Sequence, residues 1–431
     1  MIDHLRASRI TSFLIYLVAI ATVGLSVERH QTFILFTAYF SAFFCYLWIV
    51  RLEKNIYWMV GLGVLIRIIL FFHLPNLSDD IFRFLWDGKL IREGINPFLF
   101  KPNEWIEIDP SLYEVLNSQT HYTVYPPLNQ AMFWMASFIG NQNYLLGTNV
   151  IRSFLFLADL GSVFLLIKLA SIYGRPANIA AWYFLNPLVV LEFVGNIHFE
   201  GLVIFFLLLA IYGLSKNHFV SGGLAMGLAA ATKLIPLIFL PFLMLKNRWK
   251  NGVLLSAISL TILVATLLPI IIPGSFFGFK ESLMLYSNKF EFNASIYFIV
   301  REIGWLLKGY NPIETWGPWL SVSTFISIML FSFYAAKNNW KIPNALLWIL
   351  MIYLLLATTV HPWYVLTLLP LGLLSGFYFP VAWSLMVFIT YMGYGKDGYE
   401  LSLWWVVMEY VVVLGIAATE IFIKEQKLKN G

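Results

Sequence analysis

The sequence has few charged residues and almost no cysteine. Asp, Glu, Lys and Arg together make up 12% of its 431 residues, whereas ordinary soluble domains contain roughly 25%. This shortage argues against a chain of soluble domains. The one cysteine, Cys45, excludes an intramolecular disulfide. A phosphate-binding loop and a dinucleotide-type glycine fingerprint are also missing, which argues against an ATP-driven pump or a nucleotide-sugar enzyme.

Hydrophobic residues are abundant instead, at 60% of the chain. They form charge-poor runs long enough to cross a bilayer core of about 30 Å. We therefore predict an all-α polytopic membrane protein with about 12 to 14 spans, built as a single integral membrane domain over residues 1–431. Residues 10–26 read as a retained first helix, because no small-x-small cleavage site follows them. Residues 218–246, interrupted by Lys233 and Pro236, read as two short helices or a broken pair.

The basic residues predict the orientation. The net charge is +5, and the Lys and Arg residues lie mostly in short clusters between the apolar runs. This pattern orients membrane helices and does not indicate nucleic-acid binding. With both termini in the cytoplasm, residues 74–149 and 273–316 become extracytoplasmic loops, the first with juxtamembrane helices. The apolar stretch 125–140 would invert everything after it if it crossed the membrane, so we expect it to lie in or dip into the outer interface.

The stretch "LSDDIFRFLWDG" (77–88) concentrates charge next to a predicted span. Ser78 can cap a helix whose first turn holds Asp79 and Asp80, and Arg83 and Asp87 follow on the same face. Its apolar residues would face the membrane interface. One interpretation is a capping aspartate with a solvated i,i+4 ion pair. The other is a carboxylate held at the membrane boundary as a general base.

Further polar and aromatic residues fall on the same predicted side of the membrane. Lone histidines there are usually interface residues, and Trp363 suits an aromatic belt. The number of such groups on one side instead favours a shared substrate site, with these candidates: Asp87, Asn96, Tyr125, Asn196, His198, His361 and Trp363.

Lys233 raises a separate question, because a lysine at membrane depth needs a counter-ion. Snorkelling to a nearby interface is one explanation. An anionic ligand is the other, and Arg67, Arg83 and Arg301 could join Lys233 in holding a phosphate through charge-assisted hydrogen bonds.

Five segments in order resemble the GT-C glycosyltransferases, integral membrane enzymes that use polyprenyl-phosphate sugars. The segments are "SDDIFRFLWDGKLIREGINPF", "YPPLNQAMF", "NIHFEGLVIFFLLLA", "GLAMGLAAATKLIPLIFLP" and "HPWYVLTLLPL". The likeness is strongest to the bacterial polyprenyl-phosphate-mannose-dependent α-mannosyltransferases, and looser to the first mannosyltransferase of GPI-anchor synthesis. It implies a GT-C-like helical bundle in a bacterial cytoplasmic membrane, with juxtamembrane helices around an outward-facing site.

The resemblance also implies roles for residues. An acidic residue early in the first outer loop acts as base in this superfamily, which matches Asp79 or Asp80. Related enzymes place the base first in an acidic pair, so Asp79 is favoured and Asp80 would orient it, bind the acceptor or help bind a metal. Lys233 matches a lysine that contacts the donor phosphate. "NIHFE" departs from the expected "NGHND", which leaves open the role of Glu200.

These expectations combine into one hypothesis. A hexose, with mannose favoured, would pass from a polyprenyl-phosphate donor to a lipid- or glycan-linked acceptor hydroxyl with inversion. No cofactor is firmly implied, although Asp79 and Asp80 could hold Mg²⁺ or Mn²⁺. The alternatives are a transporter or a lipid or polysaccharide flippase, which predicts charges spread through mid-membrane helices, and a non-catalytic assembly protein.

Overall fold

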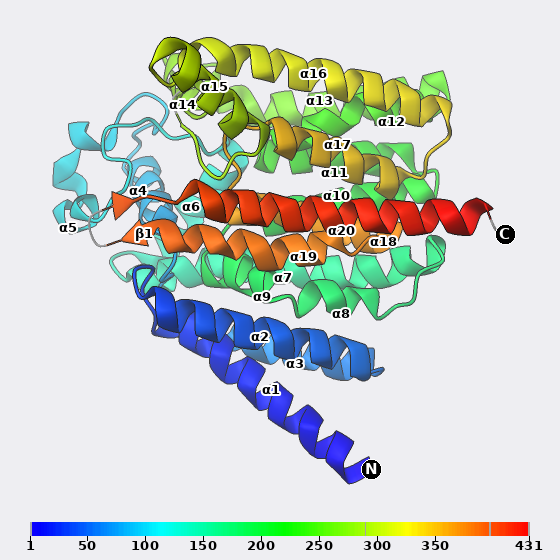
Figure 1. The fold of residues 1–431 in the computed structure, drawn as a ribbon. Helices are drawn as coiled ribbons and strands as arrows, with labels where there is room; N and C mark the ends of the chain where they lie inside the picture. Colours follow the sequence, from blue (N-terminus) through cyan, green and yellow to red (C-terminus); the bar gives the residue numbers. More distant parts are fainter. Residues whose placement is uncertain (1, 289, 396–397, 430–431) are drawn as a thin grey trace.

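The computed structural model describes residues 2–288, 290–395 and 398–429. Most of its helices run roughly along one direction, and most connections lie at the two ends of the bundle (Figure 1). The first part contains α1 (Ile2–Leu25), α2 (Thr32–Leu52), α3 (Ile56–Ile69), η1 (Leu70–Phe72), α4 (Asp80–Arg92), η2 (Pro102–Glu104), η3 (Ile106–Ile108), α5 (Pro110–Glu114) and α6 (Pro127–Gly140).

The middle part carries the most irregular helices. It contains α7 (Tyr144–Ile172), α8 (Ile179–Phe184), α9 (Pro187–Val189), the π-helix η4 (Val190–Gly195), α10 (Glu200–Ser215), α11 (Phe219–Thr232), η5 (Ile235–Phe239), α12 (Leu240–Lys246), α13 (Trp249–Leu267) and η6 (Leu268–Ile270).

The last part ends in one long helix. It contains α14 (Ser275–Asn288), α15 (Ile296–Lys308), α16 (Ile313–Lys337), α17 (Ile342–Leu356), η7 (Pro362–Thr367), α18 (Leu368–Ser375), α19 (Phe379–Met386), η8 (Val387–Gly393), the two-residue antiparallel strands β1 (Tyr394–Gly395) and β2 (Gly398–Tyr399), and α20 (Leu403–Lys429).

Five helices within the described residues are long and apolar enough to cross a membrane by themselves: α2, α7, α13 extended by η6, α16 and α20. A sixth candidate is the pair Pro187–Gly195 and Glu200–Ser215, which is bent by 111° at its break. Shorter apolar helices fill the rest, and several have a proline at their first or second position, where its missing N–H leaves no helical hydrogen bond unmade. The all-α polytopic class is confirmed, and the number of crossings, about 12 to 14, stays a prediction.

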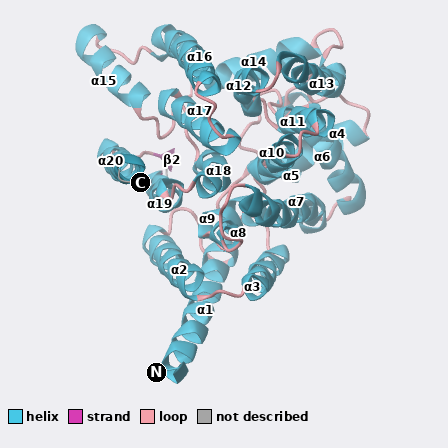
Figure 2. Cartoon of the chain, turned by 90° about the vertical axis from the view of Figure 1, so that its right-hand side faces the viewer, coloured by secondary structure: helices cyan, strands magenta, loops and turns pink. Residues whose placement is uncertain are grey.

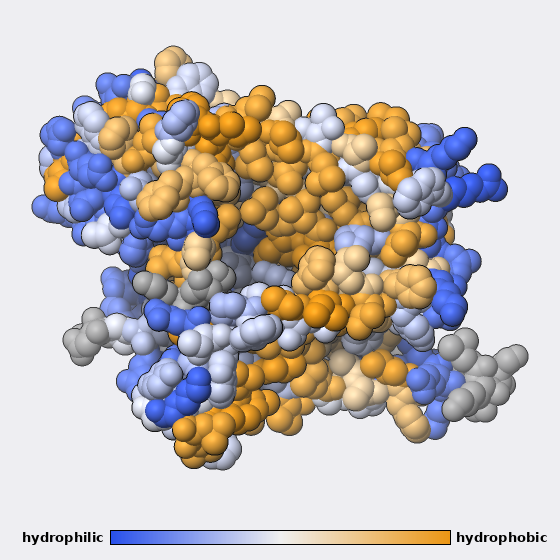
Figure 3. Space-filling view, turned by 90° about the horizontal axis from the view of Figure 1, so that it is seen from above, coloured by the Kyte–Doolittle hydropathy of each residue, from blue (hydrophilic) through white to orange (hydrophobic). Residues whose placement is uncertain are grey.

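The surface agrees with a membrane protein. Large apolar side chains point outward along the long helices, for example Phe325 and Leu330 on α16 and Val411 on α20. In Figure 3 a broad hydrophobic band separates two hydrophilic ends. Such a large exposed apolar area is unusual for a soluble protein and is typical of a lipid-facing surface.

Among the described residues the core has several parts, and two of them are the largest. The larger of the two centres on α18, which lies among α7, α8, α17 and α19 (Figure 2). The smaller of the two joins α4 to α6 and α7 at one end of the bundle, through side chains such as Phe84, Phe133 and Leu155. The loop 74–149 is therefore packed structure and not a flexible connection.

The stretch 125–140 forms α6, which packs along α4 and precedes α7. It is not among the described helices whose length and composition suit a membrane span. Gly88 of α4 makes the close contact with α6, because a Cβ at that position would lie 2.1 Å from the carbonyl oxygen of Phe133. The two helices thus form one unit at the end of the bundle.

Candidate active site

One cavity of about 780 Å³ lies where the α4–α6 unit meets the transmembrane helices. Its wall comes from elements far apart in sequence: α4, α6, the break before α10, the break after α11, α14, α16, α17 and the segment around His361. The hydrophobic face in Figure 3 is hollowed near its middle, and hydrophilic residues are visible inside the hollow. Ser321 and Thr324 of α16 line one side of the cavity, and the exposed side chains of the same helix are largely apolar. A cavity of this size can hold a small ligand.

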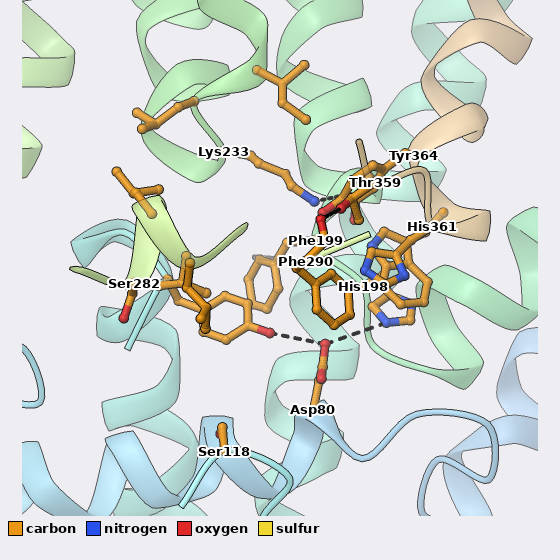
Figure 4. Close-up of a pocket in the computed structure, with 18 of the residues that line it drawn as sticks. Asp80, Ser118, His198, Phe199, Lys233, Ser282, Phe290, Thr359, His361 and Tyr364 are labelled. Atoms are coloured by element: carbon orange, nitrogen blue, oxygen red, sulfur yellow. Dashed lines mark hydrogen bonds and ion pairs between the residues drawn. The ribbon is translucent and has the colours of Figure 1, made fainter. Parts of the chain in front are cut away.

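Asp80 begins α4 and points into this cavity (Figure 4). Its Oδ2 accepts a hydrogen bond of 3.0 Å from the Tyr125 hydroxyl, and its Oδ1 accepts one of 3.2 Å from Asn117. The Nε2 of His198 lies 3.8 Å from Oδ2. Two hydrogen bonds from two segments therefore hold this carboxylate at the cavity wall, and His198 lies beside it.

Asp79 lines the same cavity but has a different partner. Its carboxylate forms an ion pair with Arg29, in the connection between α1 and α2. Burial by itself would lower the pKa of Arg29, but the neighbouring Asp79 carboxylate holds this pKa above its ordinary value. The helix begins one residue later than expected, because Asp79 and not Ser78 is at the N-cap position. The Oγ of Ser78 lies 3.4 Å from the backbone nitrogen of Asp80. The two neighbouring aspartates thus bind different partners, Asp79 a cation and Asp80 two neutral donors.

Arg83 and Asp87 form the expected i,i+4 ion pair, at 2.7 Å between Nε and Oδ1, but both side chains are buried. The interpretation of a solvated pair is therefore wrong. Arg83 also donates to the carbonyl oxygens of Ser118 and His121, and Asp87 accepts from Gln130. Arg83 reaches the cavity wall, whereas Asp87 does not line it. This pair fastens the loop after α5 to α4.

The apolar side of α4 does not face the membrane interface as expected. Ile81, Leu85 and Leu90 are fully or almost fully buried against α6 and α7. The periodicity of these residues predicts an apolar face correctly, but it does not distinguish lipid from protein as the partner of that face.

Lys233 lies in extended conformation directly after α11, before η5, so the expected break in 218–246 is confirmed. Its ammonium pairs with Glu200 and lies 4.0 Å from the centre of the Tyr364 ring. The sequence had left two explanations open for Lys233, a snorkelling side chain and an anionic ligand. The structure adds a third, because the counter-ion is a residue of the protein. Lys233 lines the cavity opposite Asp80 (Figure 4). Because an ammonium has three N–H donors, it can bind a ligand in the cavity in addition to Glu200.

Aromatic rings stack on one wall of the cavity. The ring centre of His198 lies 3.6 Å from that of Trp363, which lies 4.5 Å from that of His361. Pro362 occupies the first turn of the helix after His361, as expected, although that turn is 3₁₀. Burial, together with the charges of Lys233 and His198, holds the pKa of His361 well below its ordinary value. The stack fixes both imidazoles and presents a neutral His361 to the cavity.

Three more predicted site residues, in addition to Asp87, lie away from the cavity wall. Arg301 on α15 pairs with Glu291 and Glu302. The Asn96 side-chain amide donates a hydrogen bond to the Ser275 hydroxyl oxygen. Asn196 donates to Glu192. Each has a protein partner, and Arg67, which lines no wall either, pairs with Asp159 inside the bundle.

The sequence analysis missed Glu192, a buried carboxylate behind His198. It lies within the apolar stretch "VVLEFVG", where an isolated acidic residue is costly and thus a signal of function. Arg29, Asn117 and Tyr391 were also missed, since no local pattern marks them. Their importance comes from their partners Asp79, Asp80 and Glu192.

Among the residues that the structure describes, no group of three or more His, Cys, Asp and Glu side chains is placed to hold a metal ion.

Residues 12–247 match the family model described as alpha-(1->6)-mannopyranosyltransferase, N-terminal domain, which is more than half of the chain. The chain belongs to this family. The matched segment includes Asp80, His198 and Lys233, whereas His361 and Trp363 lie beyond it. The resemblance inferred from the sequence motifs is thereby confirmed at the level of the mannosyltransferase family.

Two curated relatives carry the same name, alpha-(1->6)-mannopyranosyltransferase A. The protein of Corynebacterium glutamicum is 27% identical over 177 residues, which cover 40% of this chain and 35% of the relative. That of Mycobacterium tuberculosis is 28% identical over 183 residues, 39% of this chain and 33% of the relative. The match therefore spans about a third of each relative's length.

Proposed function

We propose that this protein is a membrane glycosyltransferase that moves mannose from a polyprenyl-phosphate donor to a hydroxyl of a lipid- or glycan-linked acceptor. The observation that carries the proposal is the single cavity in which Asp80 and Lys233 face one another (Figure 4). The family membership supports the sugar transfer, and the names of the relatives support mannose as the sugar. The same membership favours a transferase over a transporter or flippase.

The chemistry needs one base and one site for a leaving anion. The acceptor hydroxyl loses its proton to a carboxylate as its oxygen attacks the anomeric carbon. The bond from that carbon to the phosphate oxygen breaks, and polyprenyl phosphate leaves with the electron pair. Attack from the side opposite the phosphate inverts the anomeric carbon, so a β-linked donor gives an α-linked product. Lys233 supports this step because its charge can stabilise the leaving phosphate.

We assign the base to Asp80, in place of the Asp79 favoured by the motif. Asp80 points into the cavity, while Asp79 is paired with Arg29. Tyr125 and Asn117 hold Asp80 in a fixed orientation, which places its oxygens for repeated proton transfer. Asp79 then keeps Arg29 at the rim of the cavity.

The cavity also suits a substrate with a lipid tail. Leu283, Leu285 and Leu356 add apolar surface to the polar wall formed by Asp80, His198 and Lys233. In this proposal a lipid-linked sugar would reach this wall from the side of the molecule, through the hollow on the hydrophobic face (Figure 3). The active site would face the extracytoplasmic side, as the basic clusters predict.

The test is transfer by the purified protein. Incubation with polyprenyl-phosphate mannose, glucose or galactose and a membrane lipid extract should give a mannosylated product, identified by mass spectrometry, with an α linkage. Asp80→Asn should lower kcat by about 100-fold or more, because a general base contributes about 10²- to 10⁴-fold. Asp79→Asn serves as the matched control and should retain more activity. Full activity of purified Asp80→Asn would contradict the assignment of the base.

A further inference from the structure

Glu192 is a fully buried carboxylate that does not line the cavity. Three donors from different positions meet its two oxygens: the Asn196 side chain at 3.1 Å, Nδ1 of His198 at 2.8 Å and the Tyr391 hydroxyl at 2.8 Å. An ionised carboxylate only accepts hydrogen bonds. The proton of the neutral His198 ring is therefore on Nδ1, and its Nε2 is left with a lone pair.

That lone pair faces the proposed base. Nε2 of His198 accepts a hydrogen bond of 3.3 Å from the Ser78 hydroxyl and lies 3.8 Å from Oδ2 of Asp80. The ring is clamped by stacking on Trp363. A displacement of about 1 Å would bring Nε2 and Oδ2 to hydrogen-bond distance.

The backbone is distorted at this place. Residues 190–195 form a π-helix, a rare geometry that is frequently found at functional sites. Ile197 follows with a φ of +64°, which is a genuine outlier for a β-branched residue. Hydrogen bonds from the backbone nitrogens of Asn196 and His198 to the carbonyl oxygens of Leu191 and Glu192 hold the distortion. Strain of this kind persists where the surroundings enforce it, and here it turns His198 toward the cavity.

We propose that Glu192 is a positioning residue that fixes His198 as the proton acceptor for Asp80. The inference rests on the proposed function. After sugar transfer, the proton taken from the acceptor hydroxyl is on an oxygen of Asp80. It passes to Nε2 of His198, which leaves Asp80 ionised for the next turnover and the imidazole as a cation between Glu192 and Asp80. The imidazolium then releases the proton to water in the cavity.

The charges around His198 favour this step. Carboxylates lie on both sides of the ring, from Glu192 and Asp80. The cation of Lys233 is paired with Glu200, and the pKa of His361 is held low, so this second imidazole stays neutral. The ring of His198 therefore lies between two carboxylates.

The chain offers a matched control in Glu409 on α20. This carboxylate is also buried, and it accepts hydrogen bonds from the Trp383 indole and from Asn293. It does not line the cavity or contact His198. The substitution Glu409→Gln therefore measures how much activity is lost when a buried carboxylate away from the cavity is replaced by a neutral amide.

The experiment compares Glu192→Gln with Glu409→Gln in the purified full chain. The glutamine amide can keep its oxygen toward Asn196 and Nδ1 of His198 and turn its NH₂ to the Tyr391 hydroxyl, so the hydrogen bond to the ring stays. What the variant loses is the negative charge beside the imidazolium that forms when Asp80 passes on its proton. We expect kcat to fall about 10- to 100-fold, with the donor KM changed less than about 2-fold. The acid limb of the kcat profile should move to lower pH, because the protonated ring loses its paired negative charge. Glu409→Gln should keep the wild-type profile.

Tyr391→Phe is the milder variant if Glu192→Gln does not fold. It removes one hydrogen bond to Glu192 and should lower kcat about 3- to 10-fold without changing donor KM. Wild-type kcat and pH profile in both variants would overturn the role of Glu192 while leaving the proposed transfer intact. A wild-type protein that transfers no sugar from any donor of the panel would overturn the proposed function and this inference with it.

Discussion

At the scale of single residues, the cavity combines groups whose charges are already balanced within the protein. Lys233 pairs with Glu200, Asp79 pairs with Arg29, and Asp80 is held by neutral donors. A buried charge that has a partner is far less costly than an isolated one. The polar wall can therefore persist in the absence of substrate.

The phosphate role of Lys233 can be separated from its ion pair with Glu200. We expect Lys233→Ala to lower kcat/KM for the polyprenyl-phosphate donor by about 10²- to 10³-fold, because one stabilising group for the leaving anion is lost. Acceptor KM should change little. The measurement is initial-rate kinetics with each substrate varied in turn.

The double variant Lys233→Ala with Glu200→Gln supplies the control. If Lys233 only neutralises Glu200, the double variant should regain most of the activity, since no unpaired charge remains. If Lys233 binds phosphate, the double variant should be as poor as Lys233→Ala. Recovery of activity would refute the phosphate role.

At the scale of elements, helix breaks position the site. His198 lies in the 111° bend before α10, Lys233 in the break after α11, and His361 before the 3₁₀ turn of η7. A continuous helix would direct its side chains around its axis, whereas a break can direct one residue inward. Non-helical backbone at membrane depth is tolerated only where it is buried or lines a cavity.

Contact between α4 and α6 should be sensitive at Gly88. Gly88→Ala would place a Cβ 2.1 Å from the backbone oxygen of Phe133, so the two helices must separate. Overpacking of this kind typically costs about 1 to 3 kcal/mol. We expect a lower Tm in detergent and lower transfer activity, because Asp80 lies on α4. Thermal unfolding monitored by tryptophan fluorescence measures the first effect.

Gly61→Ala on α3 is the matched control, because a Cβ there meets nothing within 4 Å. Alanine also favours helix more than glycine does. Its Tm should be unchanged or slightly higher. An equal loss of stability in both variants would show that the close approach of α4 and α6 is not the cause.

At the scale of the whole molecule, the two hydrophilic ends are separated by the hydrophobic band of Figure 3. The α4–α6 unit and the cavity lie toward one end (Figure 1). The basic clusters predict that this end is extracytoplasmic. The single cysteine makes this orientation easy to measure.

In a Cys45→Ser background, Glu107→Cys and Lys308→Cys should react with a membrane-impermeant maleimide on intact spheroplasts. Both positions are exposed in the structure and belong to the two predicted outer loops. Lys216→Cys and Lys337→Cys, which are exposed at predicted cytoplasmic positions, should react only after permeabilisation. The reverse pattern would invert the topology and place the cavity toward the cytoplasm.

The sequence by itself determined the class of protein and the outline of the site. Long apolar runs require membrane helices, because only hydrogen-bonded backbone is stable in lipid. The ordered motifs indicated the mannosyltransferase family, and eight of the predicted site residues line one cavity: Asp79, Asp80, Arg83, Tyr125, His198, Lys233, His361 and Trp363.

Only the tertiary structure decided which charges meet. Local pattern cannot show that Glu200 is the partner of Lys233, that Arg29 holds Asp79, or that Glu192 lies behind His198. It also cannot show that α4 buries its apolar face against α6 and α7. The physical reason is that helical periodicity records which side of a helix is apolar or polar, whereas the partner of each side is set by how distant helices pack.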